Sequence, residues 1–235
     1  MNLKRGLVIS LFAVSLPVAA KDINIQPLNQ SDFHALSEDL GAALSYKPLT
    51  PTAPLGITGF DVGIAVTDTK LQNRAAFANA GADISNAAVP SLRVNKGLPF
   101  GIDVGVMVGA VPSTNIKLYG GELRYAIVSG GVAMPAIGIR GSYTKLTGVD
   151  RLDFDTKGVD LSISKGLLMF TPYAGVGKVW AASTPNGIPA LSKESLSLNK
   201  VFVGINMNFG LTNLAFEGDR TGKASSYGAK LGFRF

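Results

Sequence analysis

The chain has no cysteine and a single histidine among its 235 residues. The absence of cysteine excludes disulfides and thiol chemistry. One histidine and no cysteine also leave too few ligands for an ordinary transition-metal site. The carboxylates Asp150, Asp153 and Asp155 could bind a hard cation, but their spacing matches no calcium-loop pattern. The sequence therefore predicts no metal and no cofactor.

Charge and long hydrophobic runs are also scarce. Charged residues make up 16% of the chain and the mean hydropathy is +0.27, whereas soluble domains carry about 25% charge. The longest apolar run, Gly6–Ala20, follows Lys4 and Arg5 and ends in small residues. This pattern predicts a secretory signal peptide over residues 1–20, since the run is short for the alternative, an anchor helix.

Removal of residues 1–20 takes away Lys4 and Arg5 and lowers the formal net charge of +6 by two. Such a mild positive charge does not favour a nucleic-acid partner. An exported, apolar chain without helical membrane spans can satisfy its backbone in lipid only as a closed β-barrel.

From residue 57 onward, apolar side chains alternate with small or polar ones, as in transmembrane strands. The run Phe100, Ile102, Val104, Val106 and Val108 is a clear example. The pattern predicts an all-β, closed antiparallel barrel over residues 57–235. We expect ten strands, with eight or twelve as alternatives, near 57–68, 90–97, 99–110, 116–128, 132–146, 152–165, 167–182, 196–209, 211–219 and 226–235.

The connections alternate between short and long. Tight turns are expected near residues 96–98, 129–131, 165–166 and 210, and the other connections are expected to be longer, notably 69–89 and 183–195. In outer-membrane barrels the short turns are periplasmic and the long loops extracellular. This orientation sorts the aromatic residues into two girdles. The periplasmic girdle would hold Phe60, Phe100, Tyr125, Phe170, Phe209, Phe233 and Phe235, and the outer girdle Tyr119, Tyr143, Phe154, Trp180 and Tyr227.

The last residues, "YGAKLGFRF", place apolar side chains at alternate positions and end in phenylalanine. This strand resembles the C-terminal assembly signal of bacterial outer-membrane β-barrel proteins, carried here by Tyr227, Leu231, Phe233 and Phe235. The resemblance implies location in the outer membrane of a Gram-negative bacterium and recognition by the barrel-assembly machinery. The geometry of a closed barrel separately predicts that this last strand pairs with residues 57–68.

Charged residues on the face opposite lipid form a candidate lumen network. Folding the hairpins about their turns predicts four pairs, Asp103 with Arg124, Glu122 with Arg140, Glu217 with Lys230, and Asp61 with Arg234. Asp160 lies on the same face. The network could rigidify the barrel, line a selective pore for small solutes, or carry a carboxylate-based catalytic site.

Residues 21–56 precede the barrel. Ser31 could cap a helix with the apolar stripe Phe33, Leu36, Leu40 and Leu44, and the prolines at 48, 51 and 54 predict an extended linker. Inward glycines leave volume in the barrel, so this segment could plug the lumen or remain a periplasmic tail. Residues 72–88, in the longest outer loop, could form a short helix over the mouth as a lid or contact surface.

Enzymes among outer-membrane barrels resemble one another in needing a histidine on or near the wall. The only histidine, His34, precedes the barrel and is expected on the periplasmic side, so we predict no catalytic residues. The sequence favours a non-enzymatic barrel for envelope structure or narrow solute passage, with adhesion or ligand binding through the outer loops as the alternative. Expected partners are outer-membrane lipids and lipopolysaccharide, whose phosphates could pair with the rim cations Lys145, Arg151, Lys193, Arg220 and Lys223.

Overall fold

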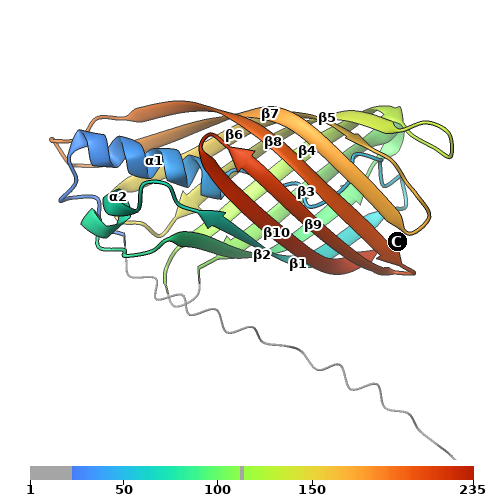
Figure 1. Ribbon diagram of the computed structural model, residues 1–235, viewed down its shortest axis with the longest axis horizontal. Coiled ribbons are helices and arrows are strands. Elements are labelled where there is room, and N and C mark those ends of the chain that lie inside the picture. Colours follow the sequence, from blue (N-terminus) through green and yellow to red (C-terminus); the bar gives the residue numbers. More distant parts are fainter. Residues whose placement is uncertain (1–22, 112–113) are drawn as a thin grey trace, which may run out of the picture.

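The computed structural model describes residues 23–111 and 114–235, and the expected signal peptide lies outside these residues. Ten antiparallel strands form one closed barrel in which each strand pairs with its sequence neighbours (Figure 1). The strands are β1 Phe60–Lys70, β2 Asn86–Gly97, β3 Ile102–Ala110, β4 Lys117–Ser129, β5 Ala136–Thr147, β6 Leu152–Ser164, β7 Phe170–Pro185, β8 Glu194–Phe209, β9 Thr212–Thr221 and β10 Ala224–Arg234. The predicted fold class and strand number are confirmed.

The first and last strands close the barrel. β10 pairs with β1 in a register that sets Arg234 opposite Asp61. Phe60 and Phe235 exchange backbone hydrogen bonds, and their rings stack with centroids 5.7 Å apart. The predicted pairing of "YGAKLGFRF" with residues 57–68 is therefore confirmed. We call the end of the barrel that holds Phe60 and Phe235 the turn end, and the opposite end the loop end.

Expected connections at both ends of the barrel differ from the structure. The β9–β10 connection at the loop end is a tight turn at Gly222 and Lys223, with Gly222 at φ +59°. The expectation of a longer loop there was wrong, because the alternation continues through residues 219–226. At the turn end, residues 130–135 form a longer connection than predicted, since β5 begins at Ala136.

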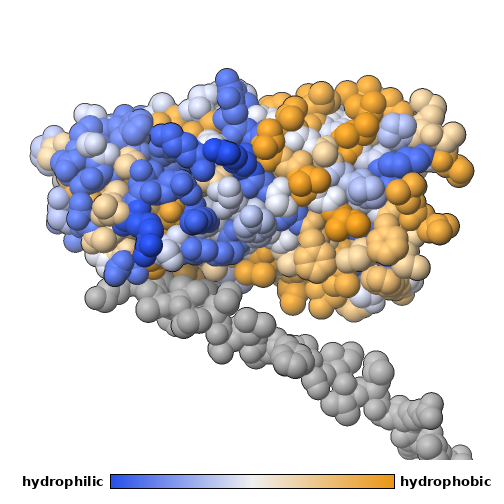
Figure 2. Space-filling model, in the orientation of Figure 1, coloured by the Kyte–Doolittle hydropathy of each residue, from blue (hydrophilic) through white to orange (hydrophobic). Residues whose placement is uncertain are grey.

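The outer surface has two zones. Apolar side chains cover the half toward the turn end, and polar ones cover the half toward the loop end (Figure 2). Strand β6 illustrates the change. Its outward residues pass from Asp153, Asp155 and Lys157 to Val159, Leu161 and Ile163. The apolar zone is the part of the barrel that suits lipid, and the polar zone extends beyond it.

Inside the barrel the two zones are exchanged, with apolar side chains toward the loop end and charges toward the turn end. The loop-end half of the lumen holds a hydrophobic cluster from both the wall and the N-terminal segment, including Phe33, Leu36, Leu118, Leu146 and Phe154. Its turn-end half holds buried charges. The outer-girdle assignment of Phe154 was wrong, because this side chain shares the inward face of β6 with Asp160 and is 1% exposed.

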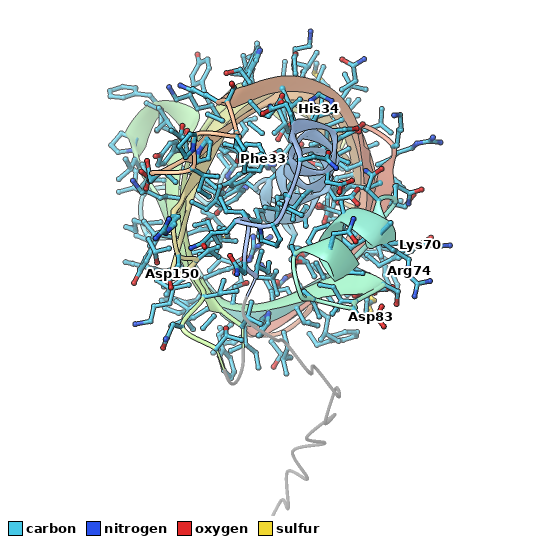
Figure 3. The ribbon with its side chains drawn as sticks, turned by 90° about the vertical axis from the view of Figure 1, so that its left-hand side faces the viewer. Phe33, His34, Lys70, Arg74, Asp83 and Asp150 are labelled. Atoms are coloured by element: carbon cyan, nitrogen blue, oxygen red, sulfur yellow. The ribbon has the colours of Figure 1, made fainter. Side chains whose placement is uncertain are left out.

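The N-terminal segment lies inside the barrel. Helix α1 (Gln30–Leu44) runs through the loop-end half, and the view along the barrel shows it within the ring of strands (Figures 1 and 3). Its buried face includes Phe33, Leu36, Leu40 and Leu44, the expected stripe. The N-cap is Asn29, whose side chain accepts a hydrogen bond from the Asp32 amide, and not Ser31. Neither helix of the described chain is long and apolar enough to cross a membrane.

Candidate functional site

The candidate site is the lumen around residues 45–55, which we call the strap. The strap follows α1, forms neither helix nor strand, and runs toward the turn end, where β1 begins. Most of it is buried, with Leu49 fully buried and Lys47 3% exposed. An extended segment cannot satisfy its own backbone polar groups, so the wall has to supply their partners.

Cations of the wall donate to the carbonyl groups of the strap. Lys200 Nζ lies 2.7 Å from the carbonyl oxygen of Tyr46, and Arg93 Nη1 lies 2.5 Å from that of Lys47. Farther along, Arg124 Nη1 donates to the carbonyl oxygen of Pro51 at 3.0 Å. These donors come from β8, β2 and β4, so they reach the strap from different sides of the barrel.

Acidic and hydroxyl groups of the wall accept from the amides of the strap. The Leu49 amide donates to Glu217 Oε2 at 2.9 Å, and the Thr52 amide donates to Ser164 Oγ at 3.1 Å. The Leu55 amide donates to Asp103 Oδ1 at 3.1 Å. The wall therefore recognises backbone groups of both kinds.

Side chains of the strap add a second set of contacts. Lys47 pairs with Asp219 at 3.0 Å, with both side chains almost fully buried. The Arg93 guanidinium lies 5.3 Å from the centroid of the Tyr46 ring. Leu49 lies against Gly228, where an added Cβ would meet Leu49 Cδ2 at 2.8 Å. Because Gly228 of β10 has no side chain, Leu49 of the strap can occupy the space beside it.

The wall charges form a connected chain. Asp103 lies 3.1 Å from Arg124, and Glu122 lies 2.7 Å from Arg140. Asp160 continues the chain, because it approaches Arg140 at 3.6 Å and Lys200 at 3.4 Å. The structure thus brings together the pairs Asp103–Arg124 and Glu122–Arg140 that the hairpins predict. Alternation of sign lets these charges remain buried.

A separate cluster joins the closing strands. Asp61 accepts from Lys230 Nζ at 2.7 Å and from Arg234 Nε at 3.0 Å. The expected pair Asp61–Arg234 is present, but the expected pair Glu217–Lys230 is not. The register sets Glu217 opposite Gly228 and Lys230 opposite Ala215, so Lys230 turns to Asp61 and Glu217 to the strap.

The wall residues that contact the strap or its partners and were missed include Arg93, Lys200, Asp219 and Tyr173. Tyr173 donates to Glu217 at 2.9 Å. The signal for two of them was available, since Asp219 shares the inward parity of Glu217, and Lys200 lies on the inward face of its strand. Asp219 was missed because it lies at the expected end of its strand, residues 211–219.

Residues 71–85, with helix α2 (Arg74–Asn79), lie at the loop end against α1, and we call them the lid. Asp39 of α1 is buried and accepts from the amides of Gln72 and Asn73 at 2.9 and 2.7 Å. Burial raises the pKa of the Asp39 carboxyl, and the hydrogen bonds from Asn73 and Gln72 oppose this increase. The short helix expected within residues 72–88 is thus held on α1.

The histidine lies at the loop end, so its expected placement on the periplasmic side was wrong. The segment before α1 starts beside the lid, where the Asn24 amide donates to the Ala80 carbonyl, and the chain then runs inward. Figure 3 shows His34 at this end of the barrel. Its Nδ1 lies 2.8 Å from Glu194 Oε2, and Gln30 contacts the same carboxylate. These contacts fasten α1 to the start of β8. Among the described residues there is no group of three or more potential metal ligands.

Substitution of Asp39 is expected to loosen the lid. Asp39→Ala removes the acceptor for two amides, and a hydrogen bond to a charged group contributes about 1.5–3 kcal/mol. Trypsin should then cut the folded protein at the exposed Arg74 roughly tenfold faster or more. Cleavage is measured by mass spectrometry, with Asp83→Ala in the same loop as control. Equal rates in both variants would show that Asp39 does not hold the lid.

A closed antiparallel barrel with an apolar outer zone and buried charges in its lumen is the architecture of an outer-membrane β-barrel protein. The chain accordingly resides in the bacterial outer membrane.

Comparison with known proteins assigns the chain to no family. No protein-family model matches the sequence, and no curated protein matches it. Similar solved structures include the outer membrane protease OmpT from Escherichia coli, at 10% identity and a TM-score of 0.39, covering 75% of this chain and 95% of that one. The attachment invasion locus protein Ail of Yersinia pestis has 13% identity and a TM-score of 0.30, covering 75% and 97%.

A third similar structure is a loop-deletion mutant of OmpT, an outer membrane protein of Vibrio cholerae, with 13% identity and a TM-score of 0.32. That likeness covers 64% of this chain, which spans 55% of the length of the other. Similarity at this level does not select an activity.

Proposed function

We propose that the protein is a non-enzymatic outer-membrane barrel whose own N-terminal segment closes the lumen to small solutes. The observation that carries this proposal is the strap, whose backbone is bound by wall residues from several strands while Leu49 and Lys47 are buried. Of the charges predicted as a pore lining, Glu217, Asp103 and Arg124 hold the backbone of the strap. The protein is therefore a closed barrel, and passage requires movement of the strap.

Conductance in planar bilayers tests the closure. Gly228→Leu puts a side chain into the space of Leu49 and should displace the strap, because a Cβ alone would already lie 2.8 Å from Leu49. The wild-type protein should remain closed, and the Gly228→Leu variant should open. The matched control is Gly218→Leu, since an added Cβ at Gly218 would meet only Tyr227, at 3.8 Å.

A wild-type protein that conducts steadily would contradict the proposal. If its ion selectivity then changed sign with Arg140→Glu, the lumen charges would line an open pore instead.

A second candidate function is adhesion or ligand binding at the loop end. The observation in its favour is the polar half of the barrel, which extends beyond the apolar zone and carries the lid (Figure 2). Binding to cells or matrix that is lost when residues 74–79 are replaced by a glycine-serine linker would support this function. Unchanged binding, or none with the wild-type protein, would exclude this surface.

A further inference from the structure

The strap is held at regularly distributed backbone groups, as a bound peptide would be. Its three prolines, at 48, 51 and 54, have no amide to satisfy. The amides of Leu49, Thr52 and Leu55, each next to one of these prolines in the sequence, all have wall acceptors. The Ala53 amide also donates to Ser164 Oγ, at 3.2 Å. The wall acceptors therefore match the amides that follow each proline.

The wall also carries pockets for particular side chains. Asp219 accepts Lys47 Nζ, and the oxygen of Thr52 lies 2.8 Å from Ser162 Oγ. The space above Gly228 accepts Leu49. Backbone contacts provide affinity and such pockets provide specificity, which is how grooves recognise extended peptides.

We propose that the lumen is a binding site for an extended, proline-containing peptide with a lysine, and that the strap occupies this site as an intramolecular ligand. The inference rests on the proposed function in that both require the strap in the lumen. It goes further, because it assigns a ligand class to the wall and makes the strap exchangeable with a peptide supplied from outside.

The chain can be cut just after the strap, which would separate the strap from the barrel that binds it. Gly56 has a positive φ of 78°, and an added Cβ there would meet no neighbour within 4 Å. Ile57 is 66% exposed. A protease recognition sequence inserted between Gly56 and Ile57 in the full chain would allow the strap to be cut from the barrel after folding.

The test is an exchange experiment on the cut protein. The protein is unfolded in urea and refolded into detergent with an excess of a fluorescent synthetic peptide that has the sequence of residues 42–56. Barrels that migrate as folded on a gel without boiling should carry the label. A peptide of reversed sequence should not label them.

Two altered peptides test the side-chain contact and the backbone contact separately. Lys47→Glu places a carboxylate against Asp219, and N-methylation at Leu49 removes the N–H group that donates to Glu217. Each should label the barrels about tenfold less than the parent peptide. Equal labelling by parent and reversed peptides, or none by the parent, would overturn the inference. The bilayer result on the uncut protein is independent of this outcome, so the two proposals can fail separately.

Discussion

An epitope inserted directly before Ile23 is expected to bind antibody on intact cells. The Asn24 amide bonds to the lid at Ala80, whereas Phe60 begins β1 at the turn end. The described N-terminal segment therefore traverses the lumen and reaches the loop end, which is extracellular in barrels of this class. The sequence alone left residues 21–56 either as a plug of the lumen or as a periplasmic tail.

The matched control is the same epitope in the 130–135 connection, which lies at the turn end and is largely exposed. Antibody should reach that site only after the outer membrane is permeabilised. Flow cytometry before and after permeabilisation measures both. Staining at residues 130–135 of intact cells, with none before Ile23, would reverse the orientation assigned to the barrel.

The second large effect is expected from Arg140→Met. Arg140 is fully buried and joins Glu122 and Asp160 in the charge chain of the wall. Without Arg140, Glu122 keeps Arg124 at 3.5 Å and Asp160 keeps Lys200 at 3.4 Å. The loss of one partner of a buried ion pair costs about 3–5 kcal/mol. The urea midpoint of the detergent-folded protein should fall, as read from gel migration without boiling.

A double variant separates the effect of the carboxylates left without Arg140 from the effect of the packing lost with the Arg140 side chain. Glu122→Gln in the Arg140→Met background removes one of these carboxylates and should recover part of the midpoint. Val201→Ala on the outer face of β8 serves as a control for general destabilisation. A midpoint that Arg140→Met leaves unchanged would mean that the chain of charges does not stabilise the barrel.

Much of the barrel is predictable from period-two alternation. Lipid contacts one face of each strand, so apolar residues occupy every second position, as in residues 100–108 and 227–235. Strand number and closure then follow from this pattern and the turns. The strand ends were less accurate. Where the outer surface becomes polar toward the loop end, the contrast between the two faces falls, and Phe154 was assigned to the wrong face.

The candidate site was predictable only in part. Inward charges follow from parity, and short hairpins fix the neighbours of Arg124 and Arg140. The course of the strap does not follow, because residues 45–55 have no periodicity and their partners come from strands far apart in the sequence. The pair Glu217–Lys230 failed because the tight turn at Gly222 and Lys223 shifts the register of β9 against β10.

The closure of β1 on β10 also constrains the order of assembly. The N-terminal segment passes through a ring whose last pairing joins the two ends of the barrel sequence, the least local contact of the fold. Either the segment enters before β10 pairs with β1, or a finished ring must be threaded. The first route avoids threading. Late pairing of β10 with β1 would then enclose the segment, and its release would require this pairing to open between Asp61 and Arg234.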